Sequence, residues 1–394
     1  MNQLTKKQIL VRQTLKNVSG FNQAAEDFTR LEISGTDLSE QYSQMSSTLK
    51  NIHPENIVTE VDRIYQNTPS SKTIRLTAAG SDLPLFQAGQ YINVFMHDFG
   101  LGTSRPYTLS SSPSSSNFYE ITIKRAPRGL VSNFILDNIK KGSLLTISDP
   151  MGSFHYNPLF HGTDLIFLAG GSGITPARSM IPELLSSALN FKVTLIHSNS
   201  YEDDVIFDKY FYQLKKNFSN FKLHHLITRP SKAYSGQVGR ISTAYLENIV
   251  KFKKTSFFYI CGPSHFNKTC LQALLELDIN RRNILIDING PPKNPELEPG
   301  WPKNHQVRQL ITVKLSNGSS FPILSGEPLL NSLEKNGILI KNRCRSGHCS
   351  LCRIHLLEGS VFQPASSLLR KSDRQFGWIH SCVAFPTSDI EIDL

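Results

Sequence analysis

Short, partly alternating apolar stretches recur from residue 56 to residue 157. They are rich in β-branched and aromatic residues, and Gly, Pro, Ser and Asp lie between them, so we expect strands joined by turns. A helical spacing interrupts them at residues 131–139. Many short strands of this kind favour a barrel or a sandwich. The expected strands span residues 58–65, 73–77, 91–96, 107–109, 119–124 and 144–148.

A different pattern runs from residue 158 to residue 292. Four continuous apolar runs, which begin at Asp164, Lys192, Lys222 and Ser256, alternate with helical stretches. Continuous apolar strands are typical of sheets that are covered on both faces. Their alternation with helices predicts a doubly wound α/β domain with a parallel sheet.

The two ends of the chain differ from the middle. Residues 293–308 are dense in proline and predict a semi-rigid linker. Residues 309–394 open with alternating strands and a short helix, which favours an α+β domain of β-grasp type. Residues 1–55 are polar, with a weak helical spacing, and we expect an N-terminal helical extension of unknown function. The expected fold is therefore multidomain: an antiparallel β-barrel, a doubly wound α/β domain and a β-grasp domain.

Composition and charge narrow the function classes. The chain has 394 residues, of which 39% are hydrophobic and 19% charged, as in ordinary globular proteins. The formal net charge is +10, but Lys and Arg are scattered rather than clustered, which argues against nucleic-acid binding and leaves open an acidic protein partner. No apolar run approaches the roughly 18–20 residues of a membrane span, and Met1–Lys16 lacks the apolar segment of a secretory signal. We expect a cytoplasmic protein.

Four of the six cysteines crowd into the last part of the chain. Cys344, Cys349 and Cys352 have the C-x₄-C-x₂-C spacing, and Cys382 lies farther on, as in plant-type [2Fe–2S] ferredoxins. One tight loop can supply three thiolates to two irons, and small loop residues let backbone N–H groups approach the sulfurs. A zinc site or reduced thiols are the alternatives, but zinc sites favour closer cysteine pairs. We expect these four cysteines to bind a [2Fe–2S] cluster.

Two segments of the expected barrel could bind a flavin. Arg105 lies on the same strand as Tyr107, so its guanidinium can bind a flavin phosphate while the aromatic ring packs against the cofactor. An edge-strand Arg beside a half-buried Tyr is the alternative. Gly129–Ser132 opens the expected helix, and a helix start presents free N–H groups that suit a pyrophosphate.

A glycine-rich turn at Gly170–Pro176 joins an apolar strand to a helix. Glycines let the backbone approach a dinucleotide, and the helix start can bind its pyrophosphate. Pro176 suits the first helical position. Cys261–Pro263 ends another strand, where ligands of open α/β sheets collect. The alternatives are a plain turn between strand and helix, and a small buried hydrophobe at Cys261.

In this order, the four segments resemble the ferredoxin–NADP⁺ reductase superfamily. Its members carry Arg-x-Tyr-Ser/Thr, a Gly-x-x-Ser helix start, a Gly-Gly-x-Gly-x-Thr/Ser-Pro turn and Cys-Gly-Pro. This chain has them at 105–108, 129–132, 170–176 and 261–263. With the ferredoxin-like module added, residues 56–394 are similar to single-chain NADH reductases that feed oxygenases, and to the reductase of the hybrid-cluster protein.

The resemblance implies FAD, with FMN as the less favoured flavin. It assigns Arg105 to the phosphates, and Tyr107 and Thr108 to the ribityl chain and flavin ring. It places Cys261 near the nicotinamide C4 and the flavin N5, so Cys261 and Thr108 are the candidate catalytic residues. The other expected cofactor contacts are Lys124, Gly129, Val131, Ser132, Gly170, Gly171, Gly173, Thr175, Pro176, Gly262 and Pro263.

The choice between NADH and NADPH depends on the stretch after the second apolar run. NADPH users of the superfamily usually place an Arg there to pair with the 2′-phosphate, but this chain has Ser200 followed by Glu202, Asp203 and Asp204. Acidic side chains repel a 2′-phosphate and can accept hydrogen bonds from ribose hydroxyls, which favours NADH. The alternative is that these acidic residues cap the next helix.

These features predict an NADH-dependent oxidoreductase. It would pass electrons through a flavin and a [2Fe–2S] cluster to a protein acceptor such as an oxygenase or a hybrid-cluster protein. Lys341, Arg343, Arg345 and Arg353 flank the cysteines, which suggests an acceptor with an acidic patch. The alternative functions are a redox sensor and an electron-transfer subunit of a fixed complex.

Overall fold

The structure is a computed structural model that describes residues 26, 54, 56–80, 82–115, 117–249 and 254–394. The helical extension expected at residues 1–55 lies outside the described residues, apart from 26 and 54. The chain divides into two compact units after Pro54, and the strands that the structure describes lie in the second unit, Glu55–Leu394. The expected boundaries at 56–157, 158–292, 293–308 and 309–394 stay predictions. Each sheet described below lies within one of these ranges.

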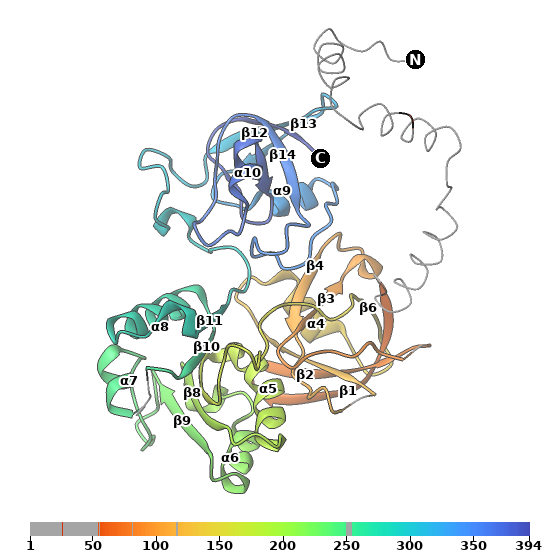
Figure 1. Cartoon of the computed structure of the whole chain (residues 1–394). Helices are drawn as coiled ribbons and strands as arrows, with labels where there is room; N and C mark the ends of the chain where they lie inside the picture. The colour runs from red at the N-terminus through yellow and green to blue at the C-terminus, as the bar shows by residue number, and fades with distance from the viewer. Residues whose placement is uncertain (1–25, 27–53, 55, 81, 116, 250–253) are drawn as a thin grey trace. The chain divides into compact units, whose positions relative to one another are not determined.

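The first sheet is an antiparallel barrel. Its elements are β1 (Ile57–Thr68), β2 (Ser71–Ala78), β3 (Tyr91–Phe95), η1 (His97–Phe99), β4 (Ser104–Thr108), β5 (Tyr119–Lys124), α4 (Leu130–Asn138) and β6 (Leu144–Ile147). The strand order is β4-β3-β6-β1-β2-β5. Figure 1 labels β1, β2, β3, β4, β6 and α4 of this domain. A bridge between Leu109, just after β4, and Ile121 of β5 joins the two edge strands and closes the barrel.

The second sheet is parallel and carries helices. Its elements are β7 (Asp164–Gly170), η2 (Gly171–Ile174), α5 (Thr175–Ser186), β8 (Lys192–Asn199), η3 (Glu202–Asp204), α6 (Asp208–Asn217), β9 (Phe221–Ile227), α7 (Thr243–Ile249), β10 (Phe257–Cys261), α8 (Ser264–Glu276), η4 (Arg281–Asn283) and β11 (Ile284–Asp287). The strand order is β11-β10-β7-β8-β9. Strand β8 pairs with one edge of β7, and β10, which comes later in the chain, pairs with the other edge of β7. The carboxyl ends of β7 and β10 therefore form a switch point, where such sheets bind ligands.

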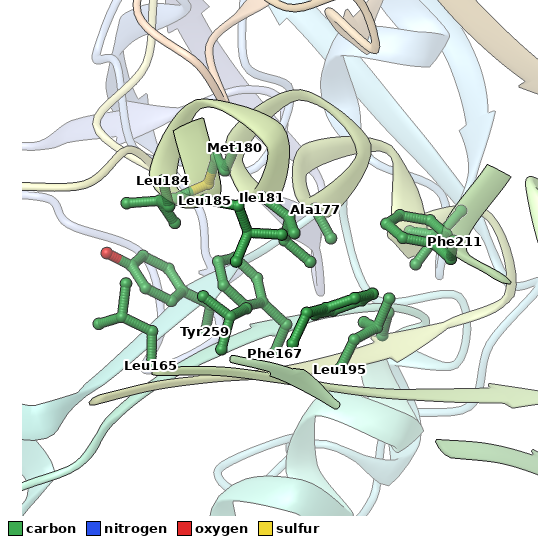
Figure 2. Packing of buried hydrophobic residues seen from close by; sticks show 14 of the residues in the cluster. Leu165, Phe167, Ala177, Met180, Ile181, Leu184, Leu185, Leu195, Phe211 and Tyr259 are labelled. Atoms are coloured by element: carbon green, nitrogen blue, oxygen red, sulfur yellow. The ribbon is translucent and has the colours of Figure 1, made fainter. Parts of the chain in front are cut away.

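Apolar packing explains the continuous apolar runs of this sheet. Figure 2 shows Leu165, Phe167 and Leu195 on the sheet facing the side chains of α5. A second cluster, which includes Ile166 and Ile260, packs on the opposite face. Each strand is therefore covered on both faces, as the sequence pattern predicts.

The C-terminal sheet is a β-grasp. The elements of this region are β12 (Leu310–Leu315), β13 (Ser320–Leu324), α9 (Leu329–Lys335), β14 (Arg353–Glu358), β15 (Val361–Phe362), α10 (Lys371–Gln375), β16 (Trp378–His380), β17 (Phe385–Pro386) and β18 (Ile390–Asp393). Strands β15 and β17 pair with each other in a separate two-stranded sheet. The order of the main sheet is β13-β12-β18-β14-β16, and α9 packs Leu329 and Leu333 on it. In β12, buried and exposed residues alternate strictly, so one face is buried.

The proline-rich linker packs against its neighbours. It contains η5 (Pro295–Leu297). Lys268 of α8 binds Glu298 with a nitrogen–oxygen distance of 2.7 Å. The Trp301 ring lies edge-on to the Phe362 ring of β15, with centroids 5.2 Å apart. These contacts fix the middle of the linker between the nucleotide domain and the C-terminal domain, and its semi-rigid character stays a prediction.

Candidate functional site

A cavity of about 780 Å³ collects most of the expected flavin residues. It lies beside β4 and the start of α4. Residues from the ferredoxin-type domain also line it, among them Glu334 and Arg345. The expected cofactor residues on its wall are Arg105, Tyr107, Thr108, Lys124, Gly129, Val131, Ser132 and Thr175.

The donors in this cavity fit the diphosphate of FAD. Helix α4 follows Gly129, and the residues at its start line the cavity, where the N–H groups of the first turn lack partners within the helix. A Cβ on Gly129 would lie 2.8 Å from the Ala126 Cβ, which explains the glycine at this close approach. Burial lowers the pKa of Arg105 to about 10, so its guanidinium is charged at neutral pH. A charged Arg beside a helix start suits a phosphate anion.

Lys124 joins the barrel to the nucleotide domain. Its Nζ lies 2.6 Å from Oδ2 of Asp204, and the hydroxyls of Thr68 and Ser70 each donate to Oδ1 of the same carboxylate at 2.6 Å. These bonds hold the pKa of Asp204 below its usual value, although burial opposes the shift. Both residues were expected to contact cofactors, and here they contact each other. Their cofactor roles stay predictions.

Residues that follow β9 contact the acidic stretch after β8. Glu202 accepts hydrogen bonds from the Ser231 N–H at 2.9 and 3.2 Å. The guanidinium of Arg229, which follows β9, lies 4.9 Å from the centre of the Tyr201 ring and 3.4 Å from Ser200 Oγ. A cation therefore lies beside Ser200 even though the local sequence lacks one.

Two glycine turns meet at the switch point of the parallel sheet. Cys261 pairs with Ala169 across β10 and β7. A Cβ on Gly173 would overlap the Cys261 carbonyl oxygen, and one on Gly262 would lie 3.2 Å from the Gly170 Cα. Only glycine permits these two turns to approach so closely. The expected nicotinamide residues of both turns are therefore brought together.

Cys261 is held by two residues that the sequence reasoning missed. Its Sγ lies 3.5 Å from Oδ2 of Asp287 and 3.6 Å from Nδ2 of Asn289. Burial raises the pKa of the Cys261 thiol, so the sulfur keeps its proton at neutral pH. Burial also raises the pKa of Asp287 to about 6. A protonated thiol is a poor nucleophile, which agrees with a positional role for Cys261.

Backbone N–H groups of the cysteine loop donate hydrogen bonds to the sulfur of Cys344. The N–H groups of Ser346, His348 and Cys349 point at Cys344 Sγ, with nitrogen–sulfur distances of 3.3–3.4 Å. Three residues of the loop have left-handed backbone conformation, at φ 51° for Arg345, 79° for Gly347 and 59° for Ser350. These conformations curl the loop around the sulfur.

The four cysteine sulfurs interact with one another. Hydrogen bonds from Cys349 and Cys382 lower the pKa of Cys344, and a hydrogen bond from Cys382 lowers that of Cys352. The pKa values of the two donors, Cys349 and Cys382, are raised in turn. Cysteines that shift one another's pKa, with backbone N–H donors on Cys344, suit the thiolate ligands of an iron–sulfur cluster. Their assignment as ligands stays a prediction.

His380 is a further residue that supports the loop. Its Nε2 lies 3.1 Å from Ser350 Oγ, and its Nδ1 lies 3.2 Å from Ser367 Oγ. The imidazole is buried. Its two bonds tie the cysteine loop to the segment before α10. An isolated His in the sequence gave no signal of this contact.

A smaller cavity of about 290 Å³ is lined by residues of all three domains. Thr108 of the flavin motif, Asp287 of the nucleotide domain, and Cys344 and Cys349 of the cysteine loop all line it. Tyr91, on β3 opposite Thr108, also faces this cavity. An expected flavin residue and two expected cluster ligands thus line one space together with Asp287, whose carboxyl group contacts the expected nicotinamide residue Cys261.

Three of the four cations that flank the cysteines bind acidic residues of the chain. Arg343 binds Asp149 at 3.1 Å, and Arg353 binds Asp373 at 3.2 Å. Arg345 is buried against Glu334. These pairs orient the cysteine loop inside the chain, so a surface for an acidic partner needs other cations.

Comparison with known proteins agrees with the three-part structure. The family model described as "Oxidoreductase FAD-binding domain" matches residues 58–156, and "Oxidoreductase NAD-binding domain" matches 167–272. The model described as "2Fe-2S iron-sulfur cluster binding domain" matches 314–387. The expected cofactors are thereby confirmed as FAD, NADH and a [2Fe–2S] cluster.

Relatives match along most of the chain. A glycine betaine monooxygenase reductase subunit of Pseudomonas aeruginosa is 28% identical over 353 residues, covering 84% of this chain and 93% of that protein. NADH oxidoreductase HCR of Escherichia coli is 25% identical, covering 84% and 95%. The solved structure of phthalate dioxygenase reductase covers 86% of this chain and 98% of its own, with a TM-score of 0.63 and 24% identity, and so shares the fold.

The order of the parts settles the family. An FAD-binding barrel, an NAD-binding α/β domain and a [2Fe–2S] domain follow one another, and residues of all three domains line one cavity. The chain is an oxidoreductase, as expected. It belongs to the ferredoxin–NADP⁺ reductase superfamily, in the group that carries a C-terminal [2Fe–2S] ferredoxin domain.

Proposed function

We propose that this protein is the reductase component of an oxygenase system, in which it delivers electrons from NADH to a metal-containing protein. The observation that carries the proposal is the shared cavity, where Thr108, Asp287, Cys344 and Cys349 lie together. Relatives named as monooxygenase reductase components support the choice of acceptor. A cytoplasmic location belongs to the same proposal, because the cysteines must stay reduced to bind a cluster.

The chain's own residues hold the reacting groups in place. Bound FAD would supply the conversion between the two-electron donor NADH and the one-electron [2Fe–2S] cluster. Arg105 and the start of α4 bind the FAD phosphates. The meeting of the glycine turns at Gly173 and Gly262 brings the nicotinamide to Cys261. The Cys261 thiol keeps its proton and serves to align the ring, while Asp287 fixes the thiol.

Asp287 predicts a pH dependence for flavin reduction by NADH. Below pH 6 its carboxyl is protonated, and above pH 6 it is an anion beside Cys261, because burial raises its pKa to about 6. The nicotinamide ring gains positive charge as the hydride leaves, and a nearby carboxylate stabilises that charge. Stopped-flow measurement should show the rate rising about tenfold through pH 6. In Asp287→Asn the step should vanish. An unchanged profile in that variant would exclude Asp287 as its source.

We also propose the surface to which the acceptor binds. Leu368 is 64% exposed, and its N–H donates to the Gly347 carbonyl oxygen of the cysteine loop at 3.0 Å. Phe376, which is 72% exposed, follows α10. Exposed Arg370, Lys371 and Arg374 complete the docking patch, which consists of Leu368, Arg370, Lys371, Arg374 and Phe376. A cationic patch with apolar side chains beside the cluster loop fits an acidic metalloprotein.

Charge reversal of the docking patch tests the acceptor proposal. In Arg370→Glu/Lys371→Glu, reduction of the acidic cytochrome b5 should slow about tenfold at low salt, and the difference should shrink at high salt. Reduction of the small anion ferricyanide by NADH should stay the same.

A matched variant separates the patch from net charge. Lys215→Glu/Lys222→Glu makes the same charge change on exposed lysines of α6 and β9. It should leave cytochrome b5 reduction near that of the unsubstituted chain. Equal slowing in both variants, or a salt-independent rate, would remove the proposed patch.

A further inference from the structure

Two arginines from distant parts of the chain share one pair of acceptors. Arg105 of the flavin motif donates Nη1 to Thr103 Oγ1 at 2.6 Å and to the Ser104 carbonyl oxygen at 2.7 Å. Arg345 of the cysteine loop donates its own Nη1 to the same two atoms, each at 3.3 Å. Guanidinium groups this close repel each other, so a negative charge must offset at least one of them.

Glu334 of α9 supplies that negative charge. Arg345 binds its carboxylate with two nitrogens, Nη1 to Oε1 at 2.7 Å and Nη2 to Oε2 at 2.8 Å. This forked geometry is the strong form of an arginine–carboxylate pair. Asn331 accepts a further bond from Nη2 at 2.7 Å, and the Arg345 residue is only 4% exposed. Both carboxylate oxygens of Glu334 therefore bind Arg345.

A single hydroxyl separates Glu334 from Arg105. Thr103 Oγ1 donates to Glu334 Oε2 at 2.9 Å while it accepts from Arg105. Burial is the main cause that lowers the pKa of Arg105, the charge of Arg345 lowers it further, and Glu334 raises it. Arg105 thus responds to both charges. If Arg345 were neutral, the freed carboxylate could turn to Arg105.

All three charged side chains line the flavin cavity. The cavity wall formed by α9 and the cysteine loop belongs to the ferredoxin-type domain, whereas Arg105 belongs to the barrel. Because Arg105 is the expected partner of the FAD phosphates, anything that draws its guanidinium toward a carboxylate competes with those phosphates.

We propose that Arg345 is a positioning residue for the flavin: by binding Glu334 it keeps the Arg105 guanidinium available to the cofactor phosphates, so that flavin affinity depends on the docked ferredoxin domain. Coupling of this kind is reciprocal, so the bound flavin also favours the docked domain. The inference concerns cofactor retention and is independent of which protein accepts the electrons.

Flavin titration of the FAD-depleted chain tests the role of Arg345. In Arg345→Gln the dissociation constant for FAD, followed by flavin fluorescence, should rise about tenfold, as for charges coupled through one network. Riboflavin has no phosphate, so its dissociation constant should stay within about twofold of that of the unsubstituted chain. An unchanged FAD affinity, or an equal loss for riboflavin, would overturn the proposal.

Two further variants separate positioning from damage. Arg345→Gln/Glu334→Gln lacks the competing carboxylate and should recover most of the FAD affinity, whereas a merely disturbed loop would gain nothing from the second change. Glu334→Gln alone should bind FAD at least as tightly as the unsubstituted chain, since Arg345 then stays charged beside Arg105. Weaker binding in Glu334→Gln, or no recovery in the double variant, would contradict the proposal. Visible circular dichroism of the cluster monitors the loop in each protein.

Discussion

Replacement of Cys382 by Ala should abolish electron transfer through the cluster while leaving the flavin reaction intact. Cys382 is buried and its sulfur interacts with those of Cys344 and Cys352. Without the fourth thiolate one iron loses a ligand, and the visible absorbance of the cluster should disappear. NADH-dependent reduction of cytochrome c should fall about a hundredfold or more, since even indirect changes at metal sites cost about 10–100-fold.

The flavin reaction provides the internal comparison. Reduction of ferricyanide by NADH requires the nucleotide and flavin sites, so in Cys382→Ala it should change by no more than about twofold. Cys270→Ala is the matched control, because Cys270 is also a buried cysteine but packs in an apolar cluster of the nucleotide domain. That variant should keep the cluster absorbance. Retention of the cluster in Cys382→Ala would show that another residue supplies the fourth ligand.

Local patterns in the sequence were sufficient to predict the fold. The alternating stretches of the barrel and the continuous apolar runs of the parallel sheet differ because one sheet is covered on one face and the other on both. The observed strand ends differ from the expected ones by a few residues. The strand expected at 107–109 is β4, Ser104–Thr108, because this segment pairs along its length with β3. Pairing between strands decides such ends, and a single strand does not reveal it.

The site was predictable where spacing reflects chemistry. The cysteine spacing and the glycine turns carry their constraint within a few neighbouring residues, and the structure brings these residues together. The residues that contact these cysteines and glycine turns could not be predicted in the same way, because tertiary packing determines them. Asp287 reaches Cys261 only because β10 and β11 pair in register, and Glu334 reaches Arg345 only because α9 packs beside the cysteine loop.

Charge patterns were the least reliable guide. The sequence suggested that cations around the cysteines face a partner, but Arg343 and Arg353 bind Asp149 and Asp373 of the same chain. Likewise, Lys124 and Asp204 bind each other. An ion pair between distant segments produces no pattern in the sequence. The sequence therefore shows where a charged residue is, but not which residue it binds.

Replacement of Gly173 by Ala should selectively disable the nicotinamide site. The added Cβ would overlap the Cys261 carbonyl oxygen and lie 2.8 Å from the Gly262 nitrogen, so the two turns must separate. This displaces Cys261, which the proposed mechanism uses to align the nicotinamide. Because displacements of about 1 Å can cost about a hundredfold in rate, kcat/KM for NADH should fall by about that factor.

The remaining cofactors show whether the damage is local. FAD content, cluster absorbance and reduction by dithionite should all match the unsubstituted chain, since the flavin cavity and the cysteine loop do not include Gly173. Gly80→Ala is the matched control, because a Cβ there meets nothing within 4 Å, and it should leave NADH kinetics unchanged. Normal kcat/KM in Gly173→Ala would mean that the turns can part without moving the reacting ring. In that case the close approach of the β7 and β10 ends serves packing, and hydride transfer must be aligned from the flavin side of the cavity.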